Sequence, residues 1–444
     1  MNYVASCLVL LTPLLAFGAD IDGWAKWRGP KDDGMARGDA PLEWSDTKNI
    51  AWKLKVPGKG NSSPIIWGDR IFVTTAVQVE GAEAAVPPKA AEPAAGGGRR
   101  GGFMRSAGAV GVMHKFVVLC IDRQSGKVLW ERVANTLPPH EGYHNRYGSY
   151  ASNTPVTDGK TLYAFFGSFG LYAFDFNGKM LWQKAFPAMR MRLEFGEGVP
   201  LTLHEDRLLV KLDSEKNSFM VVLDKNSGKE IWRVDRDEQS SWSPPLVVTV
   251  KGKKQIITSA TTRVRAYDWD SGKVVWECGG LGANVIPAPV LVDGDMVIVM
   301  SGFRDPNLLA IQLGKEGDLT GTDAVKWTNQ RGNSYTPSPV LHDGLLYFIT
   351  DNGQLSCFDA KTGKAHYQQQ RLGKPYNFKA SPVGANGKLY LSTEEGDVVV
   401  VKMGPKFEVL ATNTLENASF IATPAIVDGS IYLRSQDTLY AIRK

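Results

Sequence analysis

The chain is built on a repeat whose units each begin with a short proline-containing segment. The segments have forms such as PAPVLVDGDMVIV and PSPVLHDGLLYFI, and their prolines are Pro64, Pro155, Pro200, Pro244, Pro289, Pro339, Pro382 and Pro424. Successive prolines are 91, 45, 44, 45, 50, 43 and 42 residues apart. A period of about 40–45 residues indicates repeated units that stack on one another. The sequence therefore predicts eight units, the first of which carries an insertion.

The unit that begins at Pro339 shows most clearly what one repeat contains. Its short apolar runs are separated by Asp-Gly at 343–344 and by Asp-Asn-Gly at 351–353, which favour hairpins because these residues accept positive φ. A third turn of the form D-x-x-S/T-G-K recurs along the chain, and in most units a tryptophan follows it. Four short strands in a unit of this length are typical of a β-propeller blade.

The tryptophan after the third turn stands on the fourth strand of its unit, where we expect it to pack between adjacent blades. These residues are Trp130, Trp182, Trp232, Trp276 and Trp327. The last unit supplies three strands, and the segment 49–56 (NIAWKLKV) has the composition of the missing fourth, with Trp52 at the expected place. This pairing would close the ring and remove exposed sheet edges. We therefore predict an all-β, eight-bladed β-propeller over residues 49–444, closed by an N-terminal strand, with a lead at 20–48.

Two segments do not fit the repeat. Residues 78–113 include AAVPPKAAEPAAGGGRRGGFMR, a low-complexity stretch that cannot pack a core, so we expect a disordered insert in the first blade. Residues 1–19 contain the apolar run VASCLVLLTPLLAF followed by small residues. The run is too short to span a bilayer, and we expect a signal peptide and a secreted or periplasmic protein without a transmembrane segment.

Charge and cysteine content exclude further classes. A net charge of +5 on 444 residues is too small to indicate nucleic acid as the main partner. Beyond the signal, the chain has Cys120, Cys278 and Cys357, an odd and widely spaced set that is not a disulfide framework. We expect small buried strand residues there in preference to reactive thiols, and a monomeric protein.

The chain offers no convincing catalytic or metal-binding motif. His140 and His144 lie four residues apart with Glu141 between them, a metal-binding arrangement on a helix, but Pro138, Pro139 and Gly142 favour a loop. The Gly-Ser-Phe-Gly sequence at 167–170 falls at an expected hairpin turn and not at the strand-to-helix elbow of a hydrolase. We predict no metal site and no catalytic residues.

One face of the propeller is the best candidate for function. Connections from strand four to strand one of the next blade, and from strand two to strand three, share this face, which we call the four-to-one face. The additions at 78–113 and 134–152 both fall on it, and long loops on a rigid scaffold often carry function. The residues expected to form its ligand- or partner-binding surface are His140, His144, Arg146, Tyr150, Arg236, Glu238, Trp242, Asn284, Arg331, Tyr335 and Lys379. These residue types suit a protein or a small polar ligand. The alternative is a solvated surface whose arginines pair with nearby carboxylates.

The D-x-x-S/T-G-K-x-x-W motif and the eight units resemble the pyrroloquinoline-quinone (PQQ)-like β-propeller repeat family. That family includes quinoprotein dehydrogenases and the periplasmic scaffold that assists outer-membrane barrel assembly. The sequences WAKWRGP at 24–30 and SYASNTPVTDG at 149–159 are similar to a secreted bacterial subgroup of PQQ-like repeat proteins. The resemblance covers residues 24–444. It identifies the fold and leaves the function open, because one fold hosts many functions.

The resemblance implies two candidate functions. The first is a non-catalytic binding or protein-interaction scaffold outside the cytoplasm. The alternative is a PQQ- and Ca²⁺-dependent oxidoreductase acting on alcohols or sugars, with Ca²⁺ held by Glu, Asn and Asp and an adjacent Cys-Cys disulfide. The chain has no adjacent cysteines. The sequence therefore favours the scaffold, and we expect no cofactor.

Overall fold

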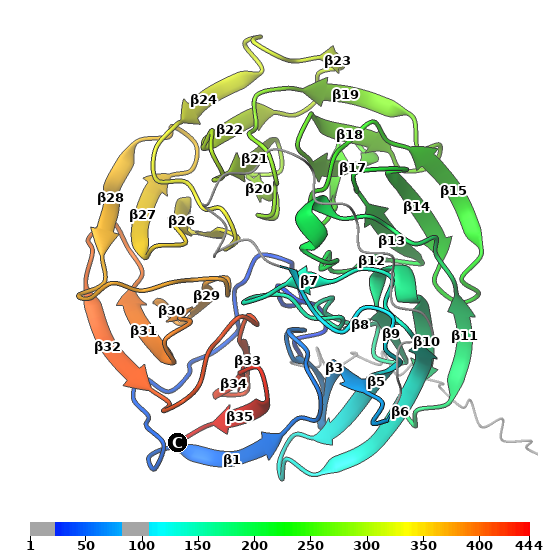
Figure 1. Ribbon diagram of the computed structural model, residues 1–444. Helices are drawn as coiled ribbons and strands as arrows, with labels where there is room; N and C mark the ends of the chain where they lie inside the picture. The colour runs from blue at the N-terminus through cyan, green and yellow to red at the C-terminus, as the bar shows by residue number, and fades with distance from the viewer. Residues whose placement is uncertain (1–22, 82–105) are drawn as a thin grey trace, which may run out of the picture.

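The computed structural model describes residues 23–81 and 106–444. Within them the chain forms eight blades, each built on four antiparallel strands, arranged as a ring around a central axis (Figure 1). This confirms the predicted fold class and the predicted number of blades. The predicted signal peptide at 1–19 lies outside the described residues. No helix in the described ranges is long and apolar enough to cross a membrane.

The first four blades follow the chain from the blue end of Figure 1 to the green. Blade 1 consists of β2 (Ile65–Trp67), β3 (Arg70–Gln78), β5 (His114–Asp122) and β6 (Val128–Leu137). Blade 2 consists of β8 (Val156–Thr157), β9 (Thr161–Phe165), β10 (Leu171–Asp175) and β11 (Met180–Lys184). Blade 3 consists of β12 (Thr202–His204), β13 (Arg207–Leu212), β14 (Phe219–Asp224) and β15 (Glu230–Asp235). Blade 4 consists of β16 (Leu246–Val250), β17 (Lys253–Ser259), β18 (Val264–Asp268) and β19 (Val274–Cys278).

The last four blades complete the ring. Blade 5 consists of β20 (Val290–Val292), β21 (Met296–Ser301), β22 (Asn307–Gln312) and β24 (Val325–Asn329). Blade 6 consists of β25 (Val340–His342), β26 (Leu345–Ile349), β27 (Gln354–Asp359) and β28 (Ala365–Arg371). Blade 7 consists of β29 (Val383–Ala385), β30 (Lys388–Ser392), β31 (Asp397–Lys402) and β32 (Val409–Thr414). Blade 8 consists of β33 (Ala425–Val427), β34 (Ser430–Arg434), β35 (Thr438–Ile442) and the N-terminal β1 (Ile50–Lys55).

Ring closure takes the predicted form. β1 pairs antiparallel with β35, with Lys53 opposite Tyr440, so the first strand of the chain supplies the outer edge of the last blade. In Figure 1 the blue β1 lies directly beside the red β35. The core lies between the blades: β14 is buried over most of its length, whereas β15 at the outer edge alternates between exposed and half-buried residues.

The third turn of a blade is closed by its own side chains. In blade 3, Asp224 Oδ1 accepts hydrogen bonds from the backbone N–H of Ser227 at 2.8 Å and from its hydroxyl at 2.6 Å. Gly228 then takes φ = 68°, a conformation that favours glycine. Asp122, Asp268 and Asp359 make the same pair of bonds in their blades. The motif is therefore a local structure that the sequence encodes directly.

The strand-four tryptophans reach the third turn of the following blade. Trp232 Nε1 donates to the carbonyl of Trp269 at 2.9 Å, and its ring lies against Gly272, where an added Cβ would come within 2.7 Å. Equivalent bonds join Trp52 to Arg123, Trp130 to Phe176, Trp182 to Lys225 and Trp327 to Ala360. The glycine of the third turn thus leaves room for the tryptophan of the preceding blade.

Trp276 on β19 differs from the other strand-four tryptophans. It is fully buried and donates to Gln255 Oε1 of its own blade at 3.3 Å. The third turn of blade 5 is longer than the others, and within it β23 (Gly317–Asp318) pairs in parallel with β19. The lengthened turn therefore covers the outer edge of blade 4.

A chain of hydrogen bonds links the residues that precede the repeat prolines. Ser338 N donates to Ser381 Oγ at 2.9 Å, Ser381 N to Thr423 Oγ1 at 3.1 Å, and Thr423 N to Ser63 Oγ at 2.9 Å. The chain continues from Ser63 N to Thr154 Oγ1 at 2.9 Å. A hydroxyl before the proline thus satisfies the buried N–H of the preceding blade, which gives the Ser/Thr-Pro pair its structural role.

The insert in blade 1 is partly described. Residues 82–105 lie outside the described residues. Residues 106–113 are ordered, because β4 (Ser106–Ala107) pairs antiparallel with β7 (Tyr143–His144) from the connection after β6. The described parts of this segment, 78–81 and 106–113, therefore have a defined backbone path, which differs from the predicted disorder. The partner strand is distant in sequence, so the low-complexity composition gave no indication of this pairing.

The lead crosses the ring on the face opposite the four-to-one face. Trp24 forms both backbone hydrogen bonds of a bridge with Ile66 of blade 1, at 2.8 and 2.9 Å. Further along, Met35 bridges to Gly384 of blade 7. Residues 24–35 therefore span the end of the central channel, which positions the side chains between them against the functional site.

Candidate functional site

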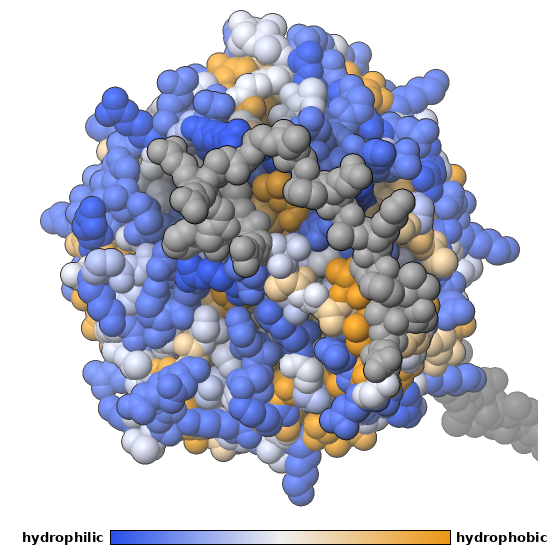
Figure 2. Space-filling view, viewed as in Figure 1, coloured by the Kyte–Doolittle hydropathy of each residue, from blue (hydrophilic) through white to orange (hydrophobic). Residues whose placement is uncertain are grey.

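A cavity of about 450 Å³ opens at the centre of the four-to-one face. Figure 2 shows apolar surface near the middle of the molecule with hydrophilic residues around it. Its aromatic lining consists of Trp27, Tyr147, Phe195, Trp242, Phe303 and Tyr335. We call this space the central cavity. Its size and its largely apolar wall with a few polar groups are typical of binding sites.

The lead forms the floor of the central cavity. Trp27 Nε1 donates to Thr423 Oγ1 at 3.0 Å. Beside it, the buried Arg28 donates to the carbonyls of Pro339 at 2.5 Å and Pro382 at 3.0 Å. Burial lowers the pKa of Arg28 to about 10, which still leaves it charged at neutral pH. A smaller cavity of about 30 Å³ lies beyond Trp27 and Arg28, so the lead closes the central cavity on that side.

Two long connections form one wall. The connection after β6 carries His144 and Tyr147, whose rings stack with centroids 4.2 Å apart. The connection after β11 carries the short helix η2 (Arg192–Glu194), in which Leu193 takes φ = 51° and is 54% exposed. Trp242 Nε1 donates to the carbonyl of Gly196 at 2.9 Å and so ties this wall to blade 4.

The polar groups around the central cavity are mainly cationic. Lys379 Nζ lies 2.5 Å from Asp351 Oδ2 and 4.4 Å from the centroid of the Tyr147 ring. Arg192 and Arg304 form no ion pair with any carboxylate in the described residues. Burial, together with the charges of Lys379 and Arg146, lowers the pKa of His144 to about 4, so this imidazole is neutral at pH 7.

The side chain of Asn284 hydrogen-bonds to Tyr335, but its Oδ1 has no partner in the described residues. Asn284 is 2% exposed, it takes φ = 58°, and its Oδ1 accepts no hydrogen bond within the described structure. Its backbone N–H donates to Thr261 Oγ1 at 3.1 Å, which holds the residue in place. A buried acceptor without a donor is costly, so this atom is available to a ligand N–H or to water.

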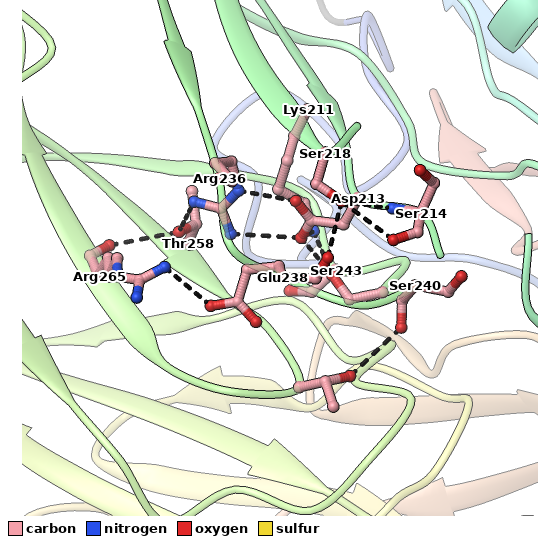
Figure 3. Close-up of polar contacts among 12 residues, drawn as sticks. Lys211, Asp213, Ser214, Ser218, Arg236, Glu238, Ser240, Ser243, Thr258 and Arg265 are labelled. Atoms are coloured by element: carbon pink, nitrogen blue, oxygen red, sulfur yellow. Dashed lines mark hydrogen bonds and ion pairs between the residues drawn. The ribbon is translucent and has the colours of Figure 1, made fainter. Parts of the chain in front are cut away.

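Buried charges from blade 3 form a network around Asp213 (Figure 3). Asp213 accepts from Arg236 Nε at 2.7 Å, from Lys211 Nζ at 2.9 Å and from Ser241 Oγ at 2.7 Å. Burial by itself would raise the pKa of Asp213, but the charges of Arg236 and Lys211 hold it well below its usual range. Since Ser241 precedes Trp242 in the chain, this network fixes the backbone that presents the indole to the central cavity.

A second group of ion pairs adjoins the first. Glu238 accepts from Arg265 at 3.0 Å and from the backbone N–H groups of Thr262 at 2.8 Å and Arg263 at 3.2 Å. Arg236 and Glu238 are each 6% exposed. They were expected on the binding surface, but they lie inside the wall between blades 3 and 4. The position of a residue in a loop did not indicate that a neighbouring blade covers its charge.

The remaining expected site residues fall into two groups. His144, Trp242, Asn284, Tyr335 and Lys379 line the central cavity. His140, Arg146, Tyr150 and Arg331 do not: Tyr150 is buried against Tyr143, Arg146 pairs with Glu394 at 3.1 Å, and His140 bonds to the carbonyl of Met189.

Several lining residues were not in the expected set, namely Trp27, Tyr147, Arg192, Phe195, Phe303 and Arg304. Tyr147 and Arg192 stood in loops that the sequence assigned to this face. Trp27 belongs to the lead, whose path across the ring no local pattern indicates.

The resemblance to quinoprotein dehydrogenases implies a Ca²⁺ site beside PQQ. The oxygen atoms at the central cavity do not fit such a site. Ca²⁺ takes six to eight oxygen ligands, most often including several carboxylates. Glu197 lines the cavity, but both of its oxygens lie 3.0 Å from the backbone N–H of Ser168. Asp351 is engaged by Lys379 and by Thr336. In the described residues no three His, Cys, Asp or Glu side chains gather as a metal site.

The cysteines do not supply the other expected feature of a quinoprotein site. Cys120, Cys278 and Cys357 are free and buried in three separate blades. Burial raises the pKa of Cys120 and of Cys357 to about 12, so both thiols remain protonated at neutral pH. They match the expected small buried strand residues.

Comparisons with known proteins agree with this architecture. A curated relative, the outer membrane protein assembly factor BamB of Moranella endobia (strain PCIT), is 25% identical over 269 residues, which are 55% of this chain and 63% of the relative. The chain thus spans less than two thirds of that relative's length.

Two solved structures share the fold. A europium-containing methanol dehydrogenase has a TM-score of 0.63 at 10% identity, covering 95% of this chain and 98% of its own. BamB from Moraxella catarrhalis has a TM-score of 0.52 at 13% identity, covering 74% and 94%. Such low identities show the fold alone.

A family model described as outer membrane protein assembly factor BamB matches residues 37–190, 114–369 and 216–444. These overlapping matches extend over nearly the whole ring of blades, as expected for a repeat that fits the model in more than one register. The chain therefore belongs to the BamB-like family of PQQ-like repeat propellers.

Proposed function

We propose that this protein is a non-catalytic scaffold outside the cytoplasm that binds another protein through its four-to-one face. The observation that carries the proposal is the central cavity, where an aromatic wall meets two arginines that form no ion pair within the described part of the chain. Aromatic residues and arginine are the types most enriched where proteins bind one another. The relatives' name, outer membrane protein assembly factor, supports a protein partner and a periplasmic location.

The form of the site supports binding in preference to catalysis. Two groups at the cavity that could transfer protons are engaged by neighbours: His144 stacks on Tyr147, and Glu197 accepts from the backbone N–H of Ser168. Leu193 exposes an apolar side chain at the mouth, where it is accessible to a partner. We further propose that the protein acts as a monomer.

Site-specific photo-crosslinking tests the proposal. A photoreactive phenylalanine analogue replaces Leu193 on the four-to-one face or, as the control, Lys361, whose side chain is 79% exposed on a third turn of the opposite face. In cells that express the full chain, we expect a discrete adduct with one envelope protein from position 193 and none from position 361.

The partner identified by mass spectrometry is then purified and its affinity for the chain is measured. We expect the Trp242→Ala variant to bind it at least about tenfold more weakly, as for loss of a central aromatic anchor. Equal adducts from both faces, or unchanged affinity of the variant, would refute the proposal. Turnover of alcohols or sugars after addition of PQQ and Ca²⁺ would favour the oxidoreductase instead.

A further inference from the structure

We infer that the central cavity binds an extended acidic segment of a polypeptide, with a carboxylate between Arg192 and Arg304 and an apolar side chain against the aromatic wall. The inference rests on the proposed function and adds to it the chemistry of the bound segment. Three independent observations on residues 23–81 and 106–444 carry it: two arginines without a carboxylate partner, the shape of the cavity, and the Oδ1 of Asn284, which accepts no hydrogen bond.

The charges select an anion. Arg192 and Arg304 come from different blades, one before β12 and the other between β21 and β22, and both line the central cavity. Neither has a carboxylate partner in the described residues, whereas Arg146, on the same face, pairs with Glu394 at 3.1 Å. Lys379 adds a third positive charge, largely neutralised by Asp351. A guanidinium binds a carboxylate through paired hydrogen bonds, so two free arginines favour an acidic side chain.

The shape selects a short segment with an apolar group. The cavity is closed at the floor by Trp27, and its volume of about 450 Å³ admits a few side chains but no folded domain. Phe195, Trp242 and Tyr335 offer aromatic side chains in its wall. A loop or a chain terminus that enters and leaves through the open mouth fits this geometry.

The free acceptor selects a ligand that carries N–H groups. Asn284 Oδ1 is buried in the lining and accepts no hydrogen bond in the described structure. A peptide backbone presents an N–H at almost every residue, whereas a simple carboxylate ligand presents acceptors alone. Pairing of a peptide N–H with Asn284 would satisfy the atom and orient the segment.

Fluorescence anisotropy with the full chain tests the inference. The probes are a labelled peptide GSLEFDWGS, the matched peptide GSLQFNWGS with both carboxylates replaced by amides, and PQQ as a non-peptide polyanion. We expect the acidic peptide to bind at least about tenfold more tightly than its amide match. Its affinity should fall as NaCl is raised from 50 to 300 mM, because the arginines are partly solvent-exposed.

Three variants locate the binding. The double variant Arg192→Gln/Arg304→Gln should weaken the acidic peptide about tenfold or more. Arg331→Gln is the matched control, since this arginine is exposed on the same face but does not line the cavity, and it should change the affinity less than twofold. Asn284→Ala should weaken both peptides by a similar factor. Circular dichroism confirms that each variant is folded.

The outcomes separate this inference from the proposed function. The inference that the bound segment is acidic would be overturned if the two peptides bound equally well. It would also be overturned if Arg331→Gln weakened binding as much as the double variant. Binding of PQQ without binding of either peptide would overturn the inference that the ligand is a polypeptide. If position 193 crosslinks to a partner while the acidic peptide does not bind, the scaffold proposal stands and this inference fails. If neither occurs, both fail.

Discussion

Trp27 donates its indole hydrogen bond to Thr423, a residue 396 positions further along the chain. The same hydroxyl accepts the backbone N–H of Ser381 at 3.1 Å and belongs to the chain of hydrogen bonds that links neighbouring blades. One threonine therefore ties the floor of the central cavity to the ring that surrounds it.

The Thr423→Val substitution tests this relationship. Valine keeps the shape but leaves the buried N–H of Ser381 and the indole of Trp27 without an acceptor. We expect a loss of about 1–3 kcal/mol in the free energy of unfolding, measured by urea denaturation. The control is Thr47→Val, at an exposed position of the lead, which should change stability by less than about 0.5 kcal/mol. Equal values would show that the hydroxyl of Thr423 has no special role.

The contact between Trp232 and Gly272 predicts that one added methyl group at position 272 lowers the stability of the protein substantially. Gly272 has φ = 69°, and an added Cβ would lie 2.7 Å from Trp232 Cε3. Gly294 has φ = 79° but open space around its Cβ, so it serves as a matched control for backbone strain. We expect Gly272→Ala to be less stable than Gly294→Ala by about 1–3 kcal/mol, as for overpacking. Identical urea midpoints would contradict the docking of Trp232 on the next blade.

The buried ion network predicts that the stability of the protein depends strongly on the carboxylate of Asp213. Asp213→Asn removes the charge that Lys211 and Arg236 share inside the protein (Figure 3). Breaking a buried network in this way costs about 3–5 kcal/mol, because it leaves buried charges uncompensated. Asp235→Asn, whose side chain is 94% exposed, should be nearly neutral. Chemical denaturation of both variants at pH 7 checks this, and comparable midpoints would refute the assignment.

Glu141 predicts a pH dependence of stability. Burial, together with the charges of Glu197 and Glu194, raises its pKa to about 8, although the hydrogen bond from the N–H of Met191 opposes the shift. The folded chain therefore binds this proton more tightly than the unfolded chain, whose glutamate has a pKa of about 4.3. Below about pH 4.3 Glu141 is protonated in both states and does not reduce the free energy of unfolding. As the pH rises from there to about 8, the free energy of unfolding falls.

The Glu141→Gln substitution should remove this dependence. One pKa unit corresponds to about 1.4 kcal/mol, so between pH 5 and pH 9 the parent should lose at least about 1 kcal/mol relative to the variant. Glu131→Gln, at an exposed position on β6, should follow the parent. Parallel pH profiles for the parent and Glu141→Gln would contradict the assigned burial.

The repeat pattern was sufficient to predict the ring of blades. The spacing of the prolines predicted eight blades, the turns between alternating apolar runs predicted four strands in each, and the strand around Trp52 predicted the closure on β35. These predictions succeeded because each depends on local chemistry. Asp224, for example, closes its turn with the hydroxyl and N–H of Ser227, three residues away.

Which loop residues reach the central cavity depends on contacts between distant parts of the chain. Trp242 and Asn284 line it, whereas Arg236 and Glu238, from a similar position in the chain, are covered by Thr258, Arg265 and their neighbours on blade 4. Trp27 reaches the cavity because the lead crosses the ring. Whether a polar side chain faces a cavity or an ion partner depends on the groups that other blades place beside it. The sequence pattern of one blade does not indicate these groups.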